Sequence, residues 1–323
     1  MGSRLSSNHR KPLEGFLIVD KPSGISSYDV IRIIRRRLSP RKIGHTGTLD
    51  PLASGVLPVV INSATKVIPF LNEKIKRYEG TLQLGVVTDS DDSTGRVLKE
   101  MTLDETELTP DRIRRGFEGF LGKIEQAPPM FSAAKHHGMP LYKLARQGVH
   151  VERRKRTVEV FSLDIRGIDL PFVDFSVSCS RGTYVRVLAR QIGDSLGVGA
   201  HLCRLRRTCS GPFTLDQSIT LEEFDKLLEV GQAEKAIVST REALIGMPEL
   251  EVGADLGARI RNGSQVFLRD VAGLRVPGLE RNQQIKIIHE GKVLAIAEAQ
   301  ITMGDPRDQA LGKTAFGLVR VFA

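Results

Sequence analysis

The sequence contains few cysteines and no long apolar run. Its 323 residues include three cysteines, Cys179, Cys203 and Cys209, and no two of them form a C-x-x-C pair. A small, odd number of thiols argues against a disulfide framework and a cysteine zinc site, and it favours a reducing compartment. No apolar stretch approaches the roughly 20 residues that a membrane-spanning helix needs. We therefore expect a cytoplasmic protein that is not inserted in a membrane.

Signatures of common cofactors are also missing. The chain has no G-x-x-x-x-G-K-[ST] loop and no Rossmann fingerprint, so no nicotinamide or flavin is implied. His136 and His137 are adjacent, so they do not share a metal-ligand face, and no glutamate stands at zincin spacing. The acidic turn at residues 88–95 lacks the final glutamate of an EF-hand loop. The sequence predicts neither a metal nor a cofactor.

Positive charge exceeds negative charge. The formal net charge is +9 and the sequence pI is about 9.6. Such an excess favours a polyanionic partner, with nucleic acid as the first expectation and an anionic membrane surface as the second. Several arginines lie in the predicted helix that ends before Pro40. They form either a solvated face or a contact surface for phosphates.

The stretch from Gly44 to Val59 concentrates glycine, threonine and proline around one acid, Asp50. Glycine permits backbone conformations and close approaches that other residues resist, and Pro51 favours an extended conformation at Asp50. A carboxylate on such a turn, just before an apolar run, is typical of a presented side chain. An ordinary turn between two core elements is the alternative reading.

Arg186 stands where helices rarely place a cation. It lies in the first turns of a helix predicted to begin near Val185 and to end at Gly197. Because the N-terminus of a helix favours anions, an arginine there calls for an anionic partner. Upstream, residues 76–86 alternate as a strand, with Tyr78 on its apolar face.

The string from Gly44 to Pro58 reads G-H-x-G-x-L-D-P-x-A-x-G-x-L-P, which resembles the signature of the TruB family of pseudouridine synthases. In that family the aspartate of the string is the nucleophile, and the resemblance assigns this role to Asp50. His45 matches the family histidine that fills the space left by a flipped nucleotide. The Asp20-Lys21-Pro22 pattern packs near the active site, which implies a supporting role for Lys21 rather than a catalytic one.

Later segments match other family motifs. The K-x-Y strand implies that Tyr78 stacks on the target base and sits where a proton moves. The arginine of G-T-Y-[IV]-R pairs with the catalytic carboxylate, which makes Arg186 the partner of Asp50, and Tyr184 reaches the target nucleotide. The A-H-x-x-x-L-R-R segment implies that Leu205 lies against the flipped base, and the D-x-x-D-x-x-G loop makes Asp92 an ionic partner of active-site cations.

RNA contacts are expected from two further segments. Apolar, aromatic and basic residues alternate over about 124–156, which suits a nucleic-acid clamp. In the family this insertion is a mobile thumb that grips the tRNA T-arm, whereas a surface hairpin packed on its own domain is the alternative. The arginines around Leu205, namely Arg204, Arg206 and Arg207, are also expected to contact RNA.

The expected fold is α/β (α+β), a pseudouridine synthase fold with a mixed, mostly antiparallel central sheet flanked by helices. We expect a flexible tail at residues 1–14, partly left from cloning, and a catalytic domain at 15–247. A small β-barrel at 248–323 resembles the PUA-like RNA-binding domain that ends many members. We read residues 258–266 there as strand and turn. An unrelated β-barrel stays open, because this part of the match is compositional.

The resemblance implies a stand-alone bacterial enzyme that isomerises uridine 55 in the T-loop of tRNAs, without a protein partner. Three alternatives stay open: a guide-RNA-dependent relative that modifies ribosomal RNA, a non-catalytic RNA-binding or RNA-folding protein, and, remotely, a phosphoenzyme hydrolase. The last reading rests on Thr46-Gly47-Thr48, but in phospho-aspartate motifs the aspartate precedes such a triplet.

Overall fold

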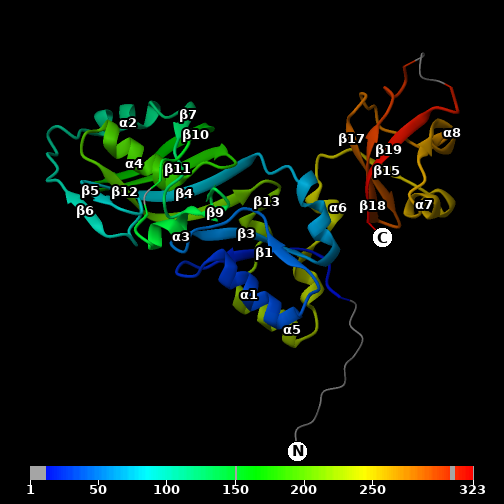
Figure 1. Ribbon diagram of the computed structural model, residues 1–323, viewed down its shortest axis with the longest axis horizontal. Helices are drawn as coiled ribbons and strands as arrows, with labels where there is room; N and C mark the ends of the chain where they lie inside the picture. The colour runs from blue at the N-terminus through cyan, green and yellow to red at the C-terminus, as the bar shows by residue number, and fades with distance from the viewer. Residues whose placement is uncertain (1–11, 150, 306–309, 323) are drawn as a thin grey trace, which may run out of the picture.

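The computed structural model describes residues 12–149, 151–305 and 310–322. It contains a large sheet with helices and a smaller β unit at the C-terminal end (Figure 1). Most of the tail expected at residues 1–14 lies outside the described residues. Within the described ranges, no helix is long and apolar enough to cross a membrane.

The large unit is built on a ten-stranded sheet, as counted over the described residues. Its main path runs β14 (Ile237–Val238), β1 (Gly15–Lys21), β3 (Ser54–Ile61), β12 (Ala200–Ser210), β4 (Ile75–Leu84), β11 (Phe172–Ser180), β10 (Arg156–Asp169) and β7 (Gly122–Gln126). The short strands β2 (Ile43–His45) and β13 (Phe213–Thr214) pair with β3 and β12. Within this sheet β12 and β3 pair in parallel and the other pairs are antiparallel. The predicted fold class is confirmed.

Strand β1 shows how the sheet is buried on both faces. Leu17 and Val19 point into one apolar core, and Phe16 and Ile18 point into another. Successive side chains of a strand alternate between faces, so an unbroken apolar run marks a strand covered on both sides.

Helices cover the sheet at its two ends (Figure 1). At one end α1 (Ser27–Leu38) lies beside α5 (Leu221–Glu229), and an ion pair between Arg37 and Asp225 joins them. At the other end lie α2 (Pro110–Glu118) and α4 (Val185–Ser195). Ser26 caps α1 with a reciprocal capping box that includes Asp29, which satisfies backbone donors that the helix start leaves free.

Shorter elements connect these parts. They are the 3-10 helices η1 (Asn62–Phe70), η2 (Leu215–Gln217) and η3 (Ala233–Ala236), the strand pair β5 (Val86–Thr88) and β6 (Val97–Glu100), and α6 (Thr240–Ala243).

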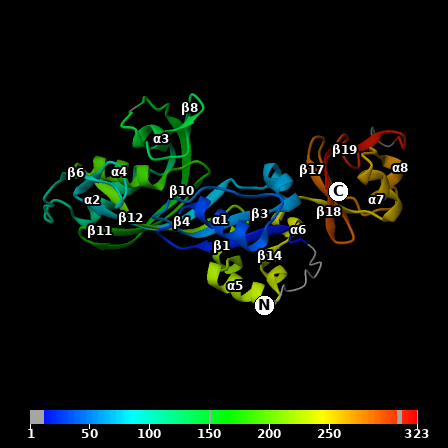
Figure 2. The ribbon, with the colours of Figure 1, turned by 60° about the horizontal axis from the view of Figure 1, so that its bottom comes forward.

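The predicted thumb leaves the sheet between β7 and β10. These two strands pair from Gly122 opposite Val160 to Gln126 opposite Arg156, so the ends of the 124–156 segment belong to the sheet. Between them lie β8 (Lys135–His136), β9 (Met139–Pro140) and α3 (Leu141–Arg146). Figure 2 shows α3 and β8 raised above one face of the sheet.

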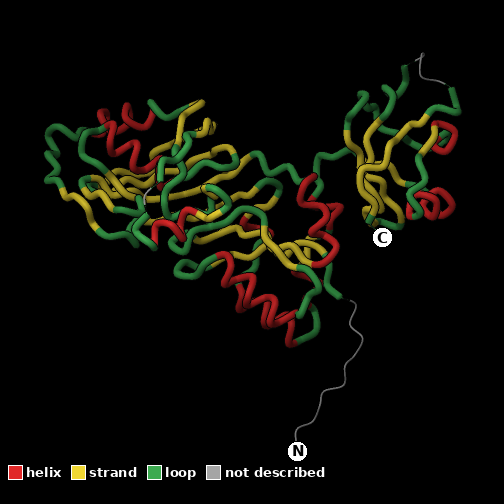
Figure 3. Tube along the Cα trace, viewed as in Figure 1, coloured by secondary structure: helices red, strands yellow, loops and turns green. Residues whose placement is uncertain are grey.

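The C-terminal unit is a curled five-stranded sheet in the order β15 (Glu249–Glu251), β17 (Gln284–His289), β18 (Lys292–Ala299), β19 (Thr314–Val321) and β16 (Val266–Phe267). Two helices, α7 (Ala254–Arg261) and α8 (Leu268–Val271), pack at its side (Figure 3). The strand expected over 258–266 was wrong for its first half. Gly257 and Ile260 are buried three residues apart, which is a helical spacing, so residues 258–261 continue α7.

The two units share an apolar junction. Ile288, Val293 and Ile296 of the C-terminal sheet join the cluster that contains Phe16 and Val60 of the large sheet. The C-terminal unit is therefore packed onto the large sheet by buried apolar side chains.

Candidate active site

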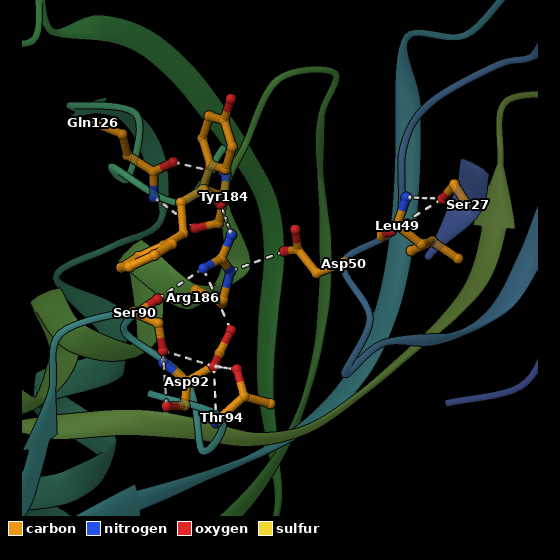
Figure 4. A network of polar contacts seen from close by, with 10 residues as sticks. Ser27, Leu49, Asp50, Ser90, Asp92, Thr94, Gln126, Tyr184 and Arg186 are labelled. Atoms are coloured by element: carbon orange, nitrogen blue, oxygen red, sulfur yellow. Dashed lines mark hydrogen bonds and ion pairs between the residues drawn. The ribbon is translucent and has the colours of Figure 1, made fainter. Parts of the chain in front are cut away.

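The segment that carries Asp50 is fixed on both sides. Thr46 donates its backbone N–H to the Pro58 carbonyl at 3.0 Å. The Ser27 hydroxyl accepts from the Leu49 N–H at 2.8 Å and lies 3.0 Å from the Leu49 carbonyl (Figure 4). Leu49 is buried in the core, so the residue before Asp50 is anchored while the carboxylate itself extends outward.

Gly55 has a packing reason to be glycine. Its φ is +99°, and a Cβ there would lie 2.2 Å from the carbonyl oxygen of Arg207. The parallel contact between β3 and β12 therefore requires the absence of a side chain at this position.

Arg186 lies against Asp50, as expected. Its Nε donates to Asp50 Oδ2 at 2.8 Å, although the residues are 136 positions apart (Figure 4). The Arg186 side chain is 4% exposed and that of Asp50 is 35% exposed. The carboxylate is thus paired on one side and open on the other.

The rest of the Arg186 guanidinium is also bound. Nη1 donates to the Ser90 carbonyl at 2.7 Å and lies 3.3 Å from Asp92 Oδ2. Nη2 donates to the Phe131 carbonyl at 3.0 Å, which comes from the segment between β7 and β10. A buried guanidinium with this many acceptors is held in one orientation.

Asp92 is itself fixed within its loop. Its Oδ1 accepts from the Ser90 hydroxyl at 2.7 Å, the Thr94 hydroxyl at 2.6 Å and the Thr94 N–H at 3.0 Å. Asp92 therefore contacts the buried Arg186 guanidinium with one oxygen and its own loop with the other.

The charge of Asp50 reflects opposing effects. Burial raises the pKa of the Asp50 carboxyl above its ordinary value, Arg186 lowers it and Asp92 raises it further. The net direction is upward, so Arg186 offsets only part of the cost of burial. The open third of the side-chain surface lets solvent reduce that cost in the free protein.

Tyr78 and Arg207 lie on facing strands. Their Cα atoms are register partners across β4 and β12. Burial raises the pKa of the Tyr78 phenol, whereas Arg207 lowers it. The phenol is therefore a neutral hydroxyl near a fixed cation.

Arg207 is buried, which contradicts the expectation that its side chain contacts RNA. Its side chain is 1% exposed, and its Nε and Nη2 donate to the carbonyls of Val56 and Gly47 at 2.8 and 2.9 Å. Arg207 thus ties together the two ends of the Asp50 segment, a role that was missed.

The other two arginines of that strand are less buried. Arg206 pairs with Asp20 at 2.8 Å, and Arg204 pairs with Asp174 at 3.3 Å.

Lys21 lies below the Asp50 turn and is 0% exposed. Its Nζ donates to the carbonyls of Ile25 and Pro22 at 2.7 and 2.8 Å and lies 3.5 Å from that of Pro51. Burial lowers the pKa of Lys21 to about 8, while Asp50 raises it. Lys21 therefore stabilises the backbone next to Asp50 through these carbonyl contacts.

The other predicted residues lie nearby along the same elements. His45 ends β2, and its Nδ1 is buried without a hydrogen-bond partner. Tyr184 is half-buried, and its N–H donates to Gln126 Oε1 at 2.9 Å. Leu205 is buried on β12. Their contacts with a nucleotide stay predictions.

The described residues contain no group of three or more His, Cys, Asp or Glu side chains that could hold a metal ion. The geometry does provide the partly exposed carboxylate of Asp50, the buried guanidinium of Arg186 that pairs with it, and the buried phenol of Tyr78. This arrangement suits nucleophilic or proton-transfer chemistry at a carboxylate.

Comparison with known proteins shows the family of this chain. Residues 35–185 match the family model "TruB family pseudouridylate synthase (N terminal domain)", and residues 186–246 match "tRNA pseudouridylate synthase B C-terminal domain". A protein named tRNA pseudouridine synthase B from Geobacter sulfurreducens is 46% identical over 89% of this chain and 94% of that protein. The protein of the same name from Geotalea uraniireducens is 44% identical over 96% and 98%.

Solved structures agree. A Cbf5-Nop10-Gar1 complex contains a chain that is 28% identical, with a TM-score of 0.70, over 96% of this chain and 85% of that one. These matches define a pseudouridine synthase, an isomerase that acts on RNA. More particularly, the chain belongs to the TruB family of pseudouridylate synthases.

Proposed function

We propose that this protein is a tRNA pseudouridine synthase that converts uridine 55 in the T-loop of tRNAs to pseudouridine, with Asp50 as the nucleophile. The observation that carries the proposal is the 2.8 Å contact between Asp50 and a buried Arg186, in a chain of this family. The relatives named tRNA pseudouridine synthase B support tRNA as the substrate.

The reaction breaks the N-glycosidic bond of the uridine, turns the base and rejoins it to the sugar through carbon. No electron is exchanged with another molecule and no atom is added, so no cofactor is required. Asp50 attacks either the sugar C1′ or the base, or it acts by elimination at C2′. In each route an ionised carboxylate is needed, and the Arg186 guanidinium favours that form.

The target base must leave its stack before it can reach Asp50, at a cost of a few kcal/mol. Tyr78 stacks on the base and sits where a proton moves, and Leu205 lies against the other side. His45 fills the vacated space and Tyr184 contacts the nucleotide. Tyr78 and Leu205 are buried on the neighbouring strands β4 and β12, and Asp50 contributes to the raised pKa of Tyr78, which supports these roles.

The T-arm is held by the thumb and by basic side chains. The PUA-like C-terminal unit adds RNA contacts. Because phosphate contacts release counterions, affinity should fall steeply with salt. The enzyme works without an obligatory protein partner, in the cytoplasm.

The test is to incubate the protein alone with unmodified tRNA and to map pseudouridine at single-base resolution. We expect modification at uridine 55 only, and no turnover by Asp50→Asn. Loss of the nucleophile should lower the rate by at least about 10⁴-fold. Binding of the same tRNA should persist, since Asn keeps the size of the side chain.

Two outcomes would contradict the proposal. Full activity of D50N would show that Asp50 is not the nucleophile. Binding of tRNA by the wild-type protein with no pseudouridine formed would favour a non-catalytic RNA-binding protein.

A further inference from the structure

The loop at residues 88–95 contacts helix α4 through two neighbouring carboxylates. Arg186 contacts Asp92, and one helical turn later Arg190 Nε lies 3.1 Å from Asp91 Oδ1. Arg190 also lies 3.2 Å from Asp194 on its own helix. The Asp91 side chain is 14% exposed and that of Asp194 is 53% exposed. Arg190 thus holds one enclosed carboxylate and one open carboxylate.

Asp91 occupies an unusual backbone conformation. Its φ is 62°, in the left-handed region that few residues other than glycine, asparagine and aspartate adopt. Its carbonyl accepts from the Leu202 N–H at 3.0 Å. The turn is therefore held by β12 through the backbone and by α4 through the Asp91 side chain.

The residues on either side of this turn hold Arg186. The Ser90 carbonyl and the Asp92 carboxylate both contact Arg186 Nη1, at 2.7 and 3.3 Å. If Asp91 relaxed toward an ordinary conformation, both acceptors would turn away. Arg186 would then keep only Phe131 and Asp50 as partners.

We propose that Asp91 and Arg190 are positioning residues, whose ion pair holds the 88–95 turn so that Ser90 and Asp92 orient Arg186 toward Asp50. In this role both residues act on Arg186 through the turn and not on the reacting nucleotide. The expected effect of these residues on catalysis rests on the proposed function. Asp91 is also one of the unspecified positions of the D-x-x-D-x-x-G pattern, so the motif did not identify it.

The charged groups around Asp50 and Asp91 determine whether the pKa of Asp50 rises or falls in a variant. Asp50 faces Arg186 from α4, Asp92 from the loop and Lys21 from β1, and it lies near Tyr78 on β4. Loss of a well-placed Arg186 would raise the pKa of Asp50.

The loop carboxylate has its own cations. Asp91 faces Arg190 and Arg186 from α4 and Arg153 from the thumb segment. Removal of the Asp91 charge at a distance would, by Coulomb's law alone, lower the pKa of Asp50. A rise in that pKa therefore reports a movement of Arg186.

The experiment compares Asp91→Asn with Asp194→Asn. Asparagine tolerates the left-handed conformation, so D91N removes the charge without changing the backbone preference. D194N is the matched control, because it removes the other partner of the same arginine. Two quantities are measured: single-turnover pseudouridine formation at saturating unmodified tRNA, and the Asp50 titration by carboxyl ¹³C NMR, assigned with D50N.

We expect D91N to slow the single turnover by about tenfold, since a misplacement of about 1 Å can cost up to 10²-fold. The Asp50 midpoint should rise by about one pH unit, as for the loss of part of an ion pair. D194N should change neither quantity. Arg190→Gln should reproduce the slow turnover, and Arg190→Lys should restore part of the rate.

The inference is overturned if D91N and D194N behave alike, or if the Asp50 midpoint falls in D91N. Thermal unfolding checks that each variant folds, and R190Q against R190K decides the question if D91N does not fold. A wild-type protein without activity would refute the proposed function instead, because the titration needs no turnover.

Discussion

The two units of the molecule differ in what they bury. Among the described residues, the buried charged side chains of the large unit include Lys21, Asp92, Arg186 and Arg207. Beyond residue 247 the described buried polar or charged side chains reduce to Lys286. Lys286 lies at the junction, where its Nζ donates to the carbonyls of Arg241 and Leu244 at 3.1 and 3.2 Å.

The contrast shows where stability has been given up for chemistry. A buried charge costs free energy unless hydrogen bonds and opposite charges compensate it, so a core built for stability alone would be apolar. The core of the C-terminal unit fits that description, with Ile260, Ile285 and Phe316 all fully buried. The large unit keeps fixed charges beneath Asp50, as a preorganised electrostatic site requires.

The largest effect that sharpens this contrast is expected from Arg186→Ala. The change leaves Asp50 and Asp92 without their shared cation, and it should lower single-turnover pseudouridine formation by about 10²–10³-fold, the scale of losing one preorganised electrostatic partner. Rapid-quench kinetics with saturating tRNA measures it. A rate close to that of the wild type would mean that the buried pair has no part in the chemistry.

An intermediate effect is expected from Lys21→Met as a function of pH. The folded pKa of Lys21 is lowered from 10.5 to about 8, so between these values the unfolded chain binds more protons and wild-type stability rises with pH. The stability of the wild type relative to K21M should therefore increase by up to about 3 kcal/mol across this window. Urea unfolding at a series of pH values measures the difference, and a difference that does not change with pH would show that burial does not lower the pKa of Lys21 in the folded protein.

The smallest effect is expected in the apolar unit. Ile260→Val removes one buried methylene and should cost about 1 kcal/mol of unfolding free energy, with the single-turnover rate unchanged. Ile192→Val makes the same change on the helix that carries Arg186 and serves as the matched control for stability. If I260V slowed the chemical step at saturating tRNA, the C-terminal unit would contribute to the chemistry as well as to stability, contrary to the comparison of the two units.

The sequence predicts best what a local pattern encodes. The Asp50 turn, the strand alternation that includes Tyr78 and the helix that begins near Val185 all carry their signals within a few residues. The short helix α7 was misread in part, because two apolar contacts over two turns do not distinguish a helix from a strand followed by a turn.

Non-local partners are harder to predict. The burial of Arg207 depends on β12 lying between β3 and β4, which no local pattern specifies. The contact of Arg186 with the Phe131 carbonyl depends on the path of a long segment outside the sheet. Backbone acceptors of this kind leave no mark on residue identity, so the Ser90 and Phe131 carbonyls could not have been found from the sequence.

The parallel pairing of β12 with β3 in the large sheet has a consequence for synthesis. It places Arg206 and Arg207 of β12 opposite Ser54 and Gly55 of β3, across roughly 150 intervening residues. Contacts between such distant segments form slowly, and only after both have been made. A nascent chain that has left the ribosome only as far as β11 already carries Asp50 but has neither Arg186 nor Arg207 to hold it. Truncated translation products should therefore lack activity, and the enzyme gains its chemistry only when the last central strand is inserted.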